Sequence, residues 1–265
     1  MGIKKIVAVG MAFMSLLICA TGCGSTQSGQ KELPKKIVVG LDDAFAPMGF
    51  RDPNTNEIVG FDIDMAKEFA KRAGMEVEFK PIDWDSKEAE LKSGHIDILW
   101  NGLTIMENRA DKISFSDPYL TDSQMIVVRN DSSIQSKADL NGKVLGTQQA
   151  STGDFMYEKE ENKKTIKEMK TYPDFTNAFS DLELGRVDAL IVDEINAAYI
   201  MKQKPGSFRM VDTIFDKDLI GVGLRKEDEA LRNKINSILA DMKKDGTVDK
   251  LAEKWFGTTD MVVKQ

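Results

Sequence analysis

The sequence has few of the residues that most catalytic and metal sites need. Among 265 residues there are two cysteines, Cys19 and Cys23, and one histidine, His95. Because both cysteines lie near the N-terminus, the rest of the chain has no thiol for a disulfide or for thiolate chemistry. No His or Cys cluster suggests a metal site, and no Gly-x-Ser-x-Gly motif suggests a hydrolase. We therefore expect no metal, no cofactor and no enzymatic activity.

An excess of positive charge is also missing. The 36 Lys and Arg residues, against 43 Asp and Glu, give a formal net charge of −7. Surfaces that bind nucleic acid are basic, and no basic stripe interleaved with aromatic residues is present. Nucleic acid is therefore not expected as a partner. With 42% hydrophobic and 30% charged residues, the chain has the composition of a globular protein of one or two domains, which we expect to be a monomer.

Long hydrophobic runs are limited to one, "IVAVGMAFMSLLICATG" at residues 6–22, which follows two lysines. This run is shorter than the ~20 apolar residues of a transmembrane helix and ends in small residues. Residues 1–22 are therefore interpreted as a signal peptide rather than a membrane anchor.

The residues around Cys23 predict a lipid anchor. Ala20-Thr21-Gly22-Cys23 resembles a bacterial lipobox, in which the cysteine is lipidated and becomes the first residue of the mature chain. Two or more acyl chains there would give stable anchoring. Residues 23–34 are rich in Ser, Gly, Gln and Lys and are expected to be a flexible tether. The sequence thus predicts an exported protein held at the outer face of the cell membrane, on the periplasmic side if an outer membrane is present.

From residue 35 onward, strand-like apolar runs alternate with amphipathic helices. Strands are expected over residues 36–41, 76–80, 95–100, 143–147, 166–172 and 187–192. Helices are expected over residues 61–73, from about 86 to 93, from about 152, and around Phe175, Ala178, Phe179 and Leu182. Alternation of this kind predicts an α/β fold with a mostly parallel sheet.

A short internal similarity predicts two lobes of similar build. "LKSGHIDIL" (91–99) and "LELGRVDAL" (182–190) share a glycine that suits a helix C-cap and an aspartate that opens the next strand. Asp97 and Asp188 are therefore assigned to structure. The predicted division places residues 35–123 and 222–265 in lobe 1 and residues 124–221 in lobe 2. Two crossings of the chain between them, near 121–128 and 216–224, would form a two-strand hinge.

The stretch "NGLTIMENR" (101–109) places a permanent cation, Arg109, between two apolar runs, where it needs an anion from the protein or from a ligand. It follows the carboxyl end of the predicted strand 95–100, where α/β sheets bind ligands. Thr104 adds a hydroxyl group. "QQASTGDF" similarly follows strand 143–147 and opens a helix with Ser151 and Thr152, whose free N–H groups favour an anion.

Asp193 lies at the end of the predicted strand 187–192, where the next helix begins. One interpretation is a helix N-cap, since Asp is among the best capping residues. The other is a partner for the ammonium group of a zwitterionic ligand. The residues alone leave both interpretations open.

These stretches resemble the bacterial extracellular solute-binding proteins of family 3, the polar amino-acid receptors of ABC importers. Six motifs in one order carry the resemblance: "GFDIDMAKEFAKRAG" (60–74), "GLTIMENR" (102–109), "FSDPYL" (115–120), "LNGKVLGTQQAST" (140–152), "GRVDALIVD" (185–193) and "GVGLRK" (221–226). The resemblance implies two α/β lobes that capture an amino acid and deliver it to a membrane permease with its ATPase subunits.

The resemblance also implies residue roles. Arg109, Thr104 and Thr152 would bind the α-carboxylate, while Asp193 and the carbonyl of Gly102 would receive the α-ammonium group. Five further residues fall at positions that commonly line the side-chain pocket: Asp42, Phe45, Trp84, Asn101 and Gln148. Ala150 departs from the glycine that is frequent in the second-lobe loop, which puts the loop geometry in question.

The side chain of the ligand is left open by the sequence. Asp42 and Asp43 suit a cationic lysine or arginine, whereas Asn101, Gln148 and Gln149 suit an amide such as glutamine. Acidic ligands are disfavoured, because no second Lys or Arg is among the expected pocket residues. The alternative function is a dehydratase acting on a prephenate-like acid, because some enzymes of this kind share the scaffold, and it would need a general acid in the cleft.

Overall fold

Residues 33–159, 165–213 and 217–264 are described in a computed structural model. The predicted signal peptide, Cys23 and most of the predicted tether lie outside the described residues. No helix within the described ranges is long and apolar enough to span a membrane.

The first sheet has five strands in the order β5-β1-β6-β15-β7. Their bounds are β1 Lys36–Leu41, β5 Glu76–Pro81, β6 Ile98–Leu99, β7 Ser114–Phe115 and β15 Gly223–Leu224. β1 pairs in parallel with β5 and β6, and β15 pairs antiparallel with β6 and β7. The strand predicted over 95–100 is shorter than expected. Its first two residues do not join the ladder, because the N–H groups of His95 and Ile96 donate to the carbonyl of Glu90 in α2 at 3.1 and 3.4 Å.

The second sheet repeats this plan in the order β11-β10-β12-β9-β13. Its strands are β9 Gln124–Arg129, β10 Val144–Gln148, β11 Glu168–Tyr172, β12 Ala189–Asp193 and β13 Phe208–Thr213. β10 pairs in parallel with β11 and β12, and β9 pairs antiparallel with β12 and β13. The predicted parallel core is confirmed in both sheets, each extended by two antiparallel strands.

The repeated sequence signature marks the same connection in both sheets. Asp188 accepts the N–H of Val144 at 2.8 Å, as Asp97 does for Val38. The glycine three residues before each aspartate has a left-handed backbone, with φ of 79° at Gly94 and 70° at Gly185. The structural assignment of both aspartates is therefore confirmed, since each joins the start of one strand to its neighbour.

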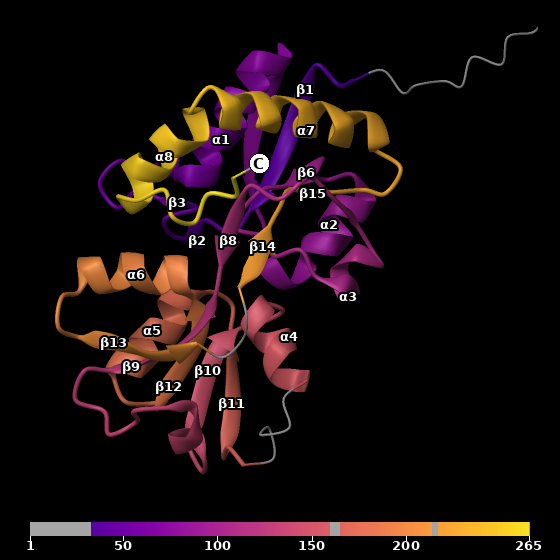
Figure 1. Cartoon of the computed structure of the whole chain (residues 1–265). Helices are drawn as coiled ribbons and strands as arrows, with labels where there is room; N and C mark the ends of the chain where they lie inside the picture. The colour runs from indigo at the N-terminus through magenta and orange to yellow at the C-terminus, as the bar shows by residue number, and fades with distance from the viewer. Residues whose placement is uncertain (1–32, 160–164, 214–216, 265) are drawn as a thin grey trace, which may run out of the picture. The chain divides into compact units, whose positions relative to one another are not determined.

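Helices and short strands cover the two sheets (Figure 1). The helices are α1 Phe61–Ala73, α2 Lys87–Ser93, α3 Glu107–Ala110, α4 Thr152–Lys159, α5 Phe175–Glu183, α6 Glu194–Gln203, α7 Glu229–Lys244 and α8 Thr247–Phe256. Two 3₁₀ turns, η1 Trp84–Ser86 and η2 Lys137–Leu140, and a small sheet of β2 Ala44–Phe45, β3 Gly49–Arg51 and β4 Ile58–Val59 complete the set. We call the first sheet with β2–β4, α1–α3, α7 and α8 the first lobe, and the second sheet with α4–α6 the second lobe.

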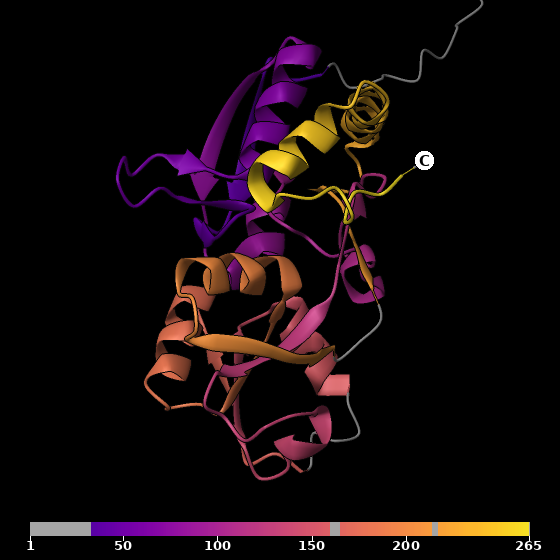
Figure 2. The same ribbon diagram turned by 60° about the vertical axis from the view of Figure 1, so that its left-hand side comes forward.

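Helix α1 shows why the sequence predicts these boundaries well. Its apolar residues face the core, acidic residues occupy its first turn and basic residues its last turn, as the helix dipole favours. Gly74 ends it with a left-handed backbone at φ 68°. Helices α7 and α8 pack against α1, so the end of the chain returns to the first lobe (Figure 2).

Two short antiparallel strands, β8 (Leu120–Asp122) and β14 (Asp218–Ile220), form a separate sheet between the two larger ones. They run side by side from one lobe to the other (Figure 1). The predicted two-strand hinge is thus confirmed, although the first crossing is shorter than 121–128 because β9 belongs to the second sheet. The residue boundaries predicted for the lobes stay a prediction.

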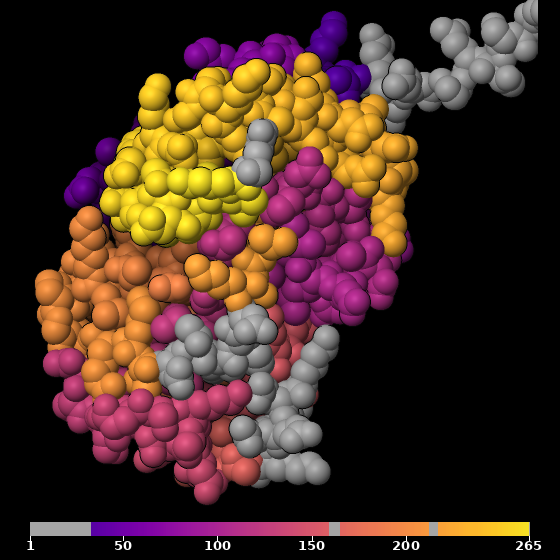
Figure 3. All heavy atoms as spheres, viewed as in Figure 1, coloured from indigo at the N-terminus to yellow at the C-terminus, as the bar shows by residue number. Residues whose placement is uncertain are grey.

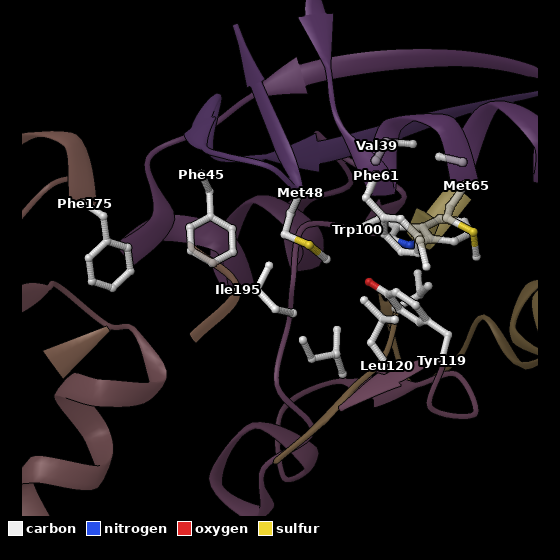
Figure 4. Close-up of a cluster of buried hydrophobic side chains, with 14 of the residues drawn as sticks. Val39, Phe45, Met48, Phe61, Met65, Trp100, Tyr119, Leu120, Phe175 and Ile195 are labelled. Carbon is white, nitrogen blue, oxygen red and sulfur yellow. The ribbon is translucent and has the colours of Figure 1, made fainter. Parts of the chain in front are cut away.

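Buried hydrophobic side chains from both lobes form a common cluster. Phe45 follows the first-lobe sheet and lies beside Phe175 of α5, with ring centroids 6.0 Å apart (Figure 4). Ile195 of α6 and Leu120 of β8 belong to the same cluster. Apolar packing therefore holds the lobes together around the cleft as well as within each lobe.

Candidate functional site

Nine of the eleven residues predicted for ligand binding line one small cavity at the carboxyl ends of the strands. They are Asp42, Phe45, Trp84, Asn101, Gly102, Gln148, Ser151, Thr152 and Asp193. The other two, Thr104 and Arg109, reach it through hydrogen bonds to Thr152. The cavity is about 10 Å³, roughly the space of one water molecule, because side chains of the two lobes contact each other across it.

Arg109 lies in the short helix α3 and is 1% exposed. Its Nη1 donates to the carbonyl of Thr104 at 3.1 Å and to the hydroxyl of Thr152 at 3.3 Å, and its Nη2 donates to the carbonyl of Ala150 at 3.3 Å. Burial lowers the pKa of Arg109 to about 10, so the guanidinium remains charged at neutral pH. Within the described ranges, no carboxylate lies within 4.0 Å of it.

Hydroxyl groups and a left-handed backbone shape the loop that faces Arg109. Thr152 begins α4 and donates its hydroxyl proton to Thr104 at 2.8 Å, which joins the two lobes. Ala150 has φ 54°, a conformation that alanine adopts at a cost of about 1 kcal/mol. Asp154 accepts the N–H of Ala150 at 2.9 Å and holds this turn. Ala150 therefore adopts a left-handed backbone conformation that glycine would adopt at lower cost.

Asp193 ends β12 directly before α6, yet its side chain makes no capping hydrogen bond to that helix. Asp193 therefore occupies the N-cap position of α6, as one interpretation predicted, but its carboxylate does not cap the helix. Gln124 donates to Oδ1 of Asp193 at 2.8 Å, and the carboxyl group of Asp122 shares a hydrogen bond with Asp193. Burial raises the pKa values of both acids, most of all that of Asp122. Burial and mutual repulsion favour one negative charge on the pair, and Asp193, which lines the cavity, is the acid that can meet a cation.

One acid, Asp42, and two amides, Asn101 and Gln148, also line the cavity. Gln148 of the second lobe donates to Oδ2 of Asp42 at 2.7 Å, and Oδ1 of Asn101 accepts the N–H of Asp42 at 3.0 Å. Burial raises the pKa of Asp42 to about 6. At neutral pH this carboxylate is largely ionised and can attract a cationic or amide-bearing side chain.

Phe45 and Trp84 are both buried, and both line the cavity at the positions expected for the side-chain pocket. Gly102 has φ 61°, and a Cβ atom there would lie 2.7 Å from the ring of Phe45. Only glycine suits this position. Trp100, in the strand region beside the cavity, is completely buried in the hydrophobic core.

Two supporting residues were missed by the sequence analysis. Asp62 is fully buried in α1, accepts the N–H of Gly102 at 2.7 Å and the hydroxyl of Tyr119 at 2.8 Å, and so fixes the first-lobe loop. Burial raises its pKa to about 7. Lys87 is a second buried cation next to Arg109, although the sequence analysis expected none. Lys87 does not line the cavity, but a second positive charge beside Arg109 weakens the argument against an acidic ligand.

A larger hollow of about 510 Å³ lies between α6 and α8 and includes Tyr199 and Trp255. Figure 3 shows the C-terminal part of the chain, in yellow, next to the region of α6, in orange. None of the eleven predicted residues lines this hollow. Within the described residues, no group of His, Cys, Asp and Glu side chains could hold a metal ion.

Residues 37–258 match the family model of the bacterial extracellular solute-binding proteins, family 3. The chain belongs to this family. It is 33% identical over 225 residues to the L-cystine-binding protein TcyJ of Escherichia coli K12, covering 83% of this chain and 82% of that protein. It is 34% identical to the arginine-binding extracellular protein ArtP of Bacillus subtilis, covering 89% and 92%.

Solved structures agree with this family. A substrate-binding protein of an ABC uptake transporter from Streptococcus pneumoniae, with bound histidine, has a TM-score of 0.82 at 35% identity and covers 87% of this chain and 95% of that one. The ancestral amino acid-binding protein AncCDT-1, a precursor of cyclohexadienyl dehydratase, has a TM-score of 0.78 at 38% identity, covering 84% and 96%. The expected two-lobed solute-binding fold is confirmed.

Proposed function

We propose that this protein captures a polar L-amino acid between its lobes and delivers it to the membrane permease and ATPase subunits of an ABC importer. The observation that carries the proposal is Arg109, a buried cation with no carboxylate within 4.0 Å among the described residues, although Glu88, Asp193 and Asp218 are near enough to favour its charge. It also donates to the second lobe through Thr152. A ligand carboxylate would supply the missing anion, and a ligand that both lobes hold stabilises the closed form.

Asp193 and the carbonyl of Gly102 are the proposed partners of the α-ammonium group. Both line the same cavity, and the Gln124 hydrogen bond orients the carboxylate of Asp193. Opposite charges are thus available for both ends of a zwitterion. A glutamine or basic side chain would meet Asp42, Asn101 and Gln148. The relatives named for binding arginine and histidine support the basic choice.

A thermal-shift screen of the mature protein against the common L-amino acids tests this proposal. A ligand that binds only the folded state raises the melting temperature with its saturation. Arg109→Ala should abolish the shift, since a carboxylate would face no cation. Arg232→Ala removes a half-exposed arginine of α7 and is the matched control. Full binding by a folded Arg109→Ala variant, or no shift with any amino acid for the unmodified protein, would contradict the proposal.

A dehydratase is the second candidate, favoured by the similarity to AncCDT-1. Asp42, with a pKa raised to about 6, is a possible general acid in the cleft. Incubation with prephenate, followed by absorbance of an aromatic product, distinguishes the two functions. We expect no turnover, because AncCDT-1 is itself described as an amino acid-binding protein.

The lipid anchor on Cys23 belongs to the proposal as well. It rests on the lipobox-like sequence, because Cys23 lies outside the described residues. After cell fractionation, a Cys23→Ala variant should be found outside the membrane fraction and should carry no acyl label. Unchanged membrane association would count against the anchor.

A further inference from the structure

Lys87, the first residue of α2, is a completely buried lysine with an unusual set of partners. Its ammonium group donates to the carbonyl of Trp84 at 2.9 Å and to the carbonyl of Ala150 at 3.0 Å. It also lies 4.9 Å from the centre of the Trp84 ring. No carboxylate of the described residues lies within 4.0 Å of this ammonium group. A buried charge without a counter-ion is costly, so such a residue calls for an explanation.

Lys87 and Arg109 converge on one atom of the opposite lobe. The carbonyl oxygen of Ala150 accepts from Nζ of Lys87 at 3.0 Å and from Nη2 of Arg109 at 3.3 Å. Ala150 directly precedes Ser151 and Thr152, which line the cavity. Two first-lobe cations therefore hold the second-lobe loop that contributes hydroxyl groups to the site. The carbonyl oxygens of Trp84, Thr104 and Ala150 compensate two positive charges poorly, and a nearby anion would stabilise both.

We propose that Lys87 is a positioning residue of the carboxylate subsite, which holds the Ala150 loop against the first lobe and adds a second positive charge beside the ligand carboxylate. This inference rests on the proposed function, because it takes an amino-acid carboxylate at Arg109. It goes further by assigning a role to a residue outside the set predicted from the sequence. Lys87 reaches the ligand through Ala150 and does not line the cavity itself.

The charged groups around Lys87 determine how its effect depends on pH. Arg109 and Lys112 disfavour its charge, Glu88 and Asp85 favour it, and burial lowers its pKa most, to about 7. A ligand carboxylate at Arg109 would raise this pKa in the bound state. Lys87 therefore binds its proton more tightly when ligand is present. The affinity should be highest below the free-state pKa of about 7 and should fall as the pH rises through that value.

Isothermal titration of three proteins tests the inference: the unmodified chain, Lys87→Met and Lys92→Met. Methionine keeps the length and apolar stem of lysine without its charge. Lys92 lies in the same helix and is exposed, so Lys92→Met removes the same charge without the Ala150 contact. The ligand is the common L-amino acid that gives the unmodified protein its largest thermal shift at about pH 6. Lys87→Met should bind it roughly 10- to 100-fold more weakly, as expected for a lost charged hydrogen bond.

The pH profile separates this role from a purely structural one. Between about pH 7 and about pH 8.5, where Asp42 is already largely ionised, the affinity of the unmodified protein and of Lys92→Met should decline, whereas that of Lys87→Met should stay level. Thermal unfolding without ligand checks that Lys87→Met folds. Should that variant fail to fold, the profile of Lys92→Met carries the test by itself, and a level profile there overturns the inference. Equal affinities and equal profiles for the two variants overturn it as well. No binding by the unmodified protein would instead refute the proposed function.

Discussion

The two lobes share one scaffold but present different chemistry to the cleft. In each lobe, three parallel strands are extended by two antiparallel ones, and an aspartate of the repeated signature joins two strand starts. The first lobe contributes two buried cations, Arg109 and Lys87, and the second contributes the Ser151 loop and Asp193. These residues lie in the segments that follow the strands, from the last residue of β12 to the first turns of α2 and α3. A repeated scaffold can therefore place opposite charges across one cleft through these segments.

The largest expected effect on ligand affinity comes from replacing Asp193, and its neighbour Asp122 provides the comparison. Asp193→Asn should weaken amino-acid binding by roughly 30- to 1,000-fold, because a buried ammonium group would lose its charged partner. Asp122→Asn should change affinity by no more than about tenfold, because Asp122 does not line the cavity and asparagine can still donate a hydrogen bond to Asp193. Isothermal titration at pH 7 measures both. Equal losses would show that Asp122, rather than Asp193 alone, carries the negative charge.

The next prediction tests whether the scaffold is equivalent in both lobes. Asp97→Ala and Asp188→Ala should each lower the free energy of unfolding by about 1.5–3 kcal/mol, because each leaves the N–H of Val38 or Val144 without its acceptor. Asp131→Ala, at a side chain 85% exposed, is the control. Urea denaturation followed by circular dichroism gives the values. A lower free energy of unfolding in only one of the two variants would show that the two aspartates are not equivalent.

A smaller effect concerns the acid of the first lobe that faces Gln148. The folded-state pKa of Asp42, about 6, lies above its ordinary value of 3.8. The folded protein therefore binds this proton more tightly, and the stability that it contributes at low pH is lost as the pH rises from about 4 through about 6. Asp42→Asn should raise the free energy of unfolding by up to about 3 kcal/mol at pH 7 and leave it unchanged at about pH 3.

Denaturant unfolding across this pH range measures the effect, with Asp43→Asn as the neighbouring control. A gain from Asp42→Asn that persists at low pH would mean that the cause is packing rather than charge. The same variant should lose affinity for amino acids with a cationic side chain more than for those with a neutral one.

The smallest effect concerns the turn of the second lobe. Ala150→Gly should raise the melting temperature slightly, equivalent to less than about 1 kcal/mol, because glycine adopts φ 54° without steric cost. Differential scanning calorimetry detects such a shift. A decrease would indicate that the methyl group of Ala150 makes contacts worth more than the backbone strain.

Local patterns were enough to predict most of the fold. Helix α1 was predicted with its observed bounds, Phe61–Ala73, because its apolar face, charged ends and terminal glycine all lie within a few residues of one another. The two-lobed fold followed from the strand and helix alternation and from the short repeat. Strand β6 was overestimated, because the N–H groups of His95 and Ile96 bond to the carbonyl of Glu90 at the end of α2 instead of to the neighbouring strand.

The supporting residues of the site could not be predicted in the same way. Lys87 looks like an ordinary first-turn lysine, and its role depends on Ala150, which is 63 residues away. Asp62 and Asp122 resemble exposed acids near a helix start and a strand end, yet folding buries both. One local signal was available: Asp62 directly follows Phe61 on the side of α1 that packs inward. Arg109, in contrast, was recognisable because a cation between two apolar runs needs an anion wherever the chain places it.

The central claim is that separate lobes bind the two charged ends of one amino acid, and truncated ligands test it most directly. The preferred amino acid, its decarboxylated amine and its deaminated acid are titrated against the unmodified protein, Arg109→Ala and Asp193→Asn. We predict that Arg109→Ala binds the amine almost as well as the unmodified protein does, because the amine has no carboxylate to lose a partner. Likewise, Asp193→Asn should bind the deaminated acid almost as well, because that ligand has no ammonium group. Uniform losses for all three ligands in both variants would contradict the account.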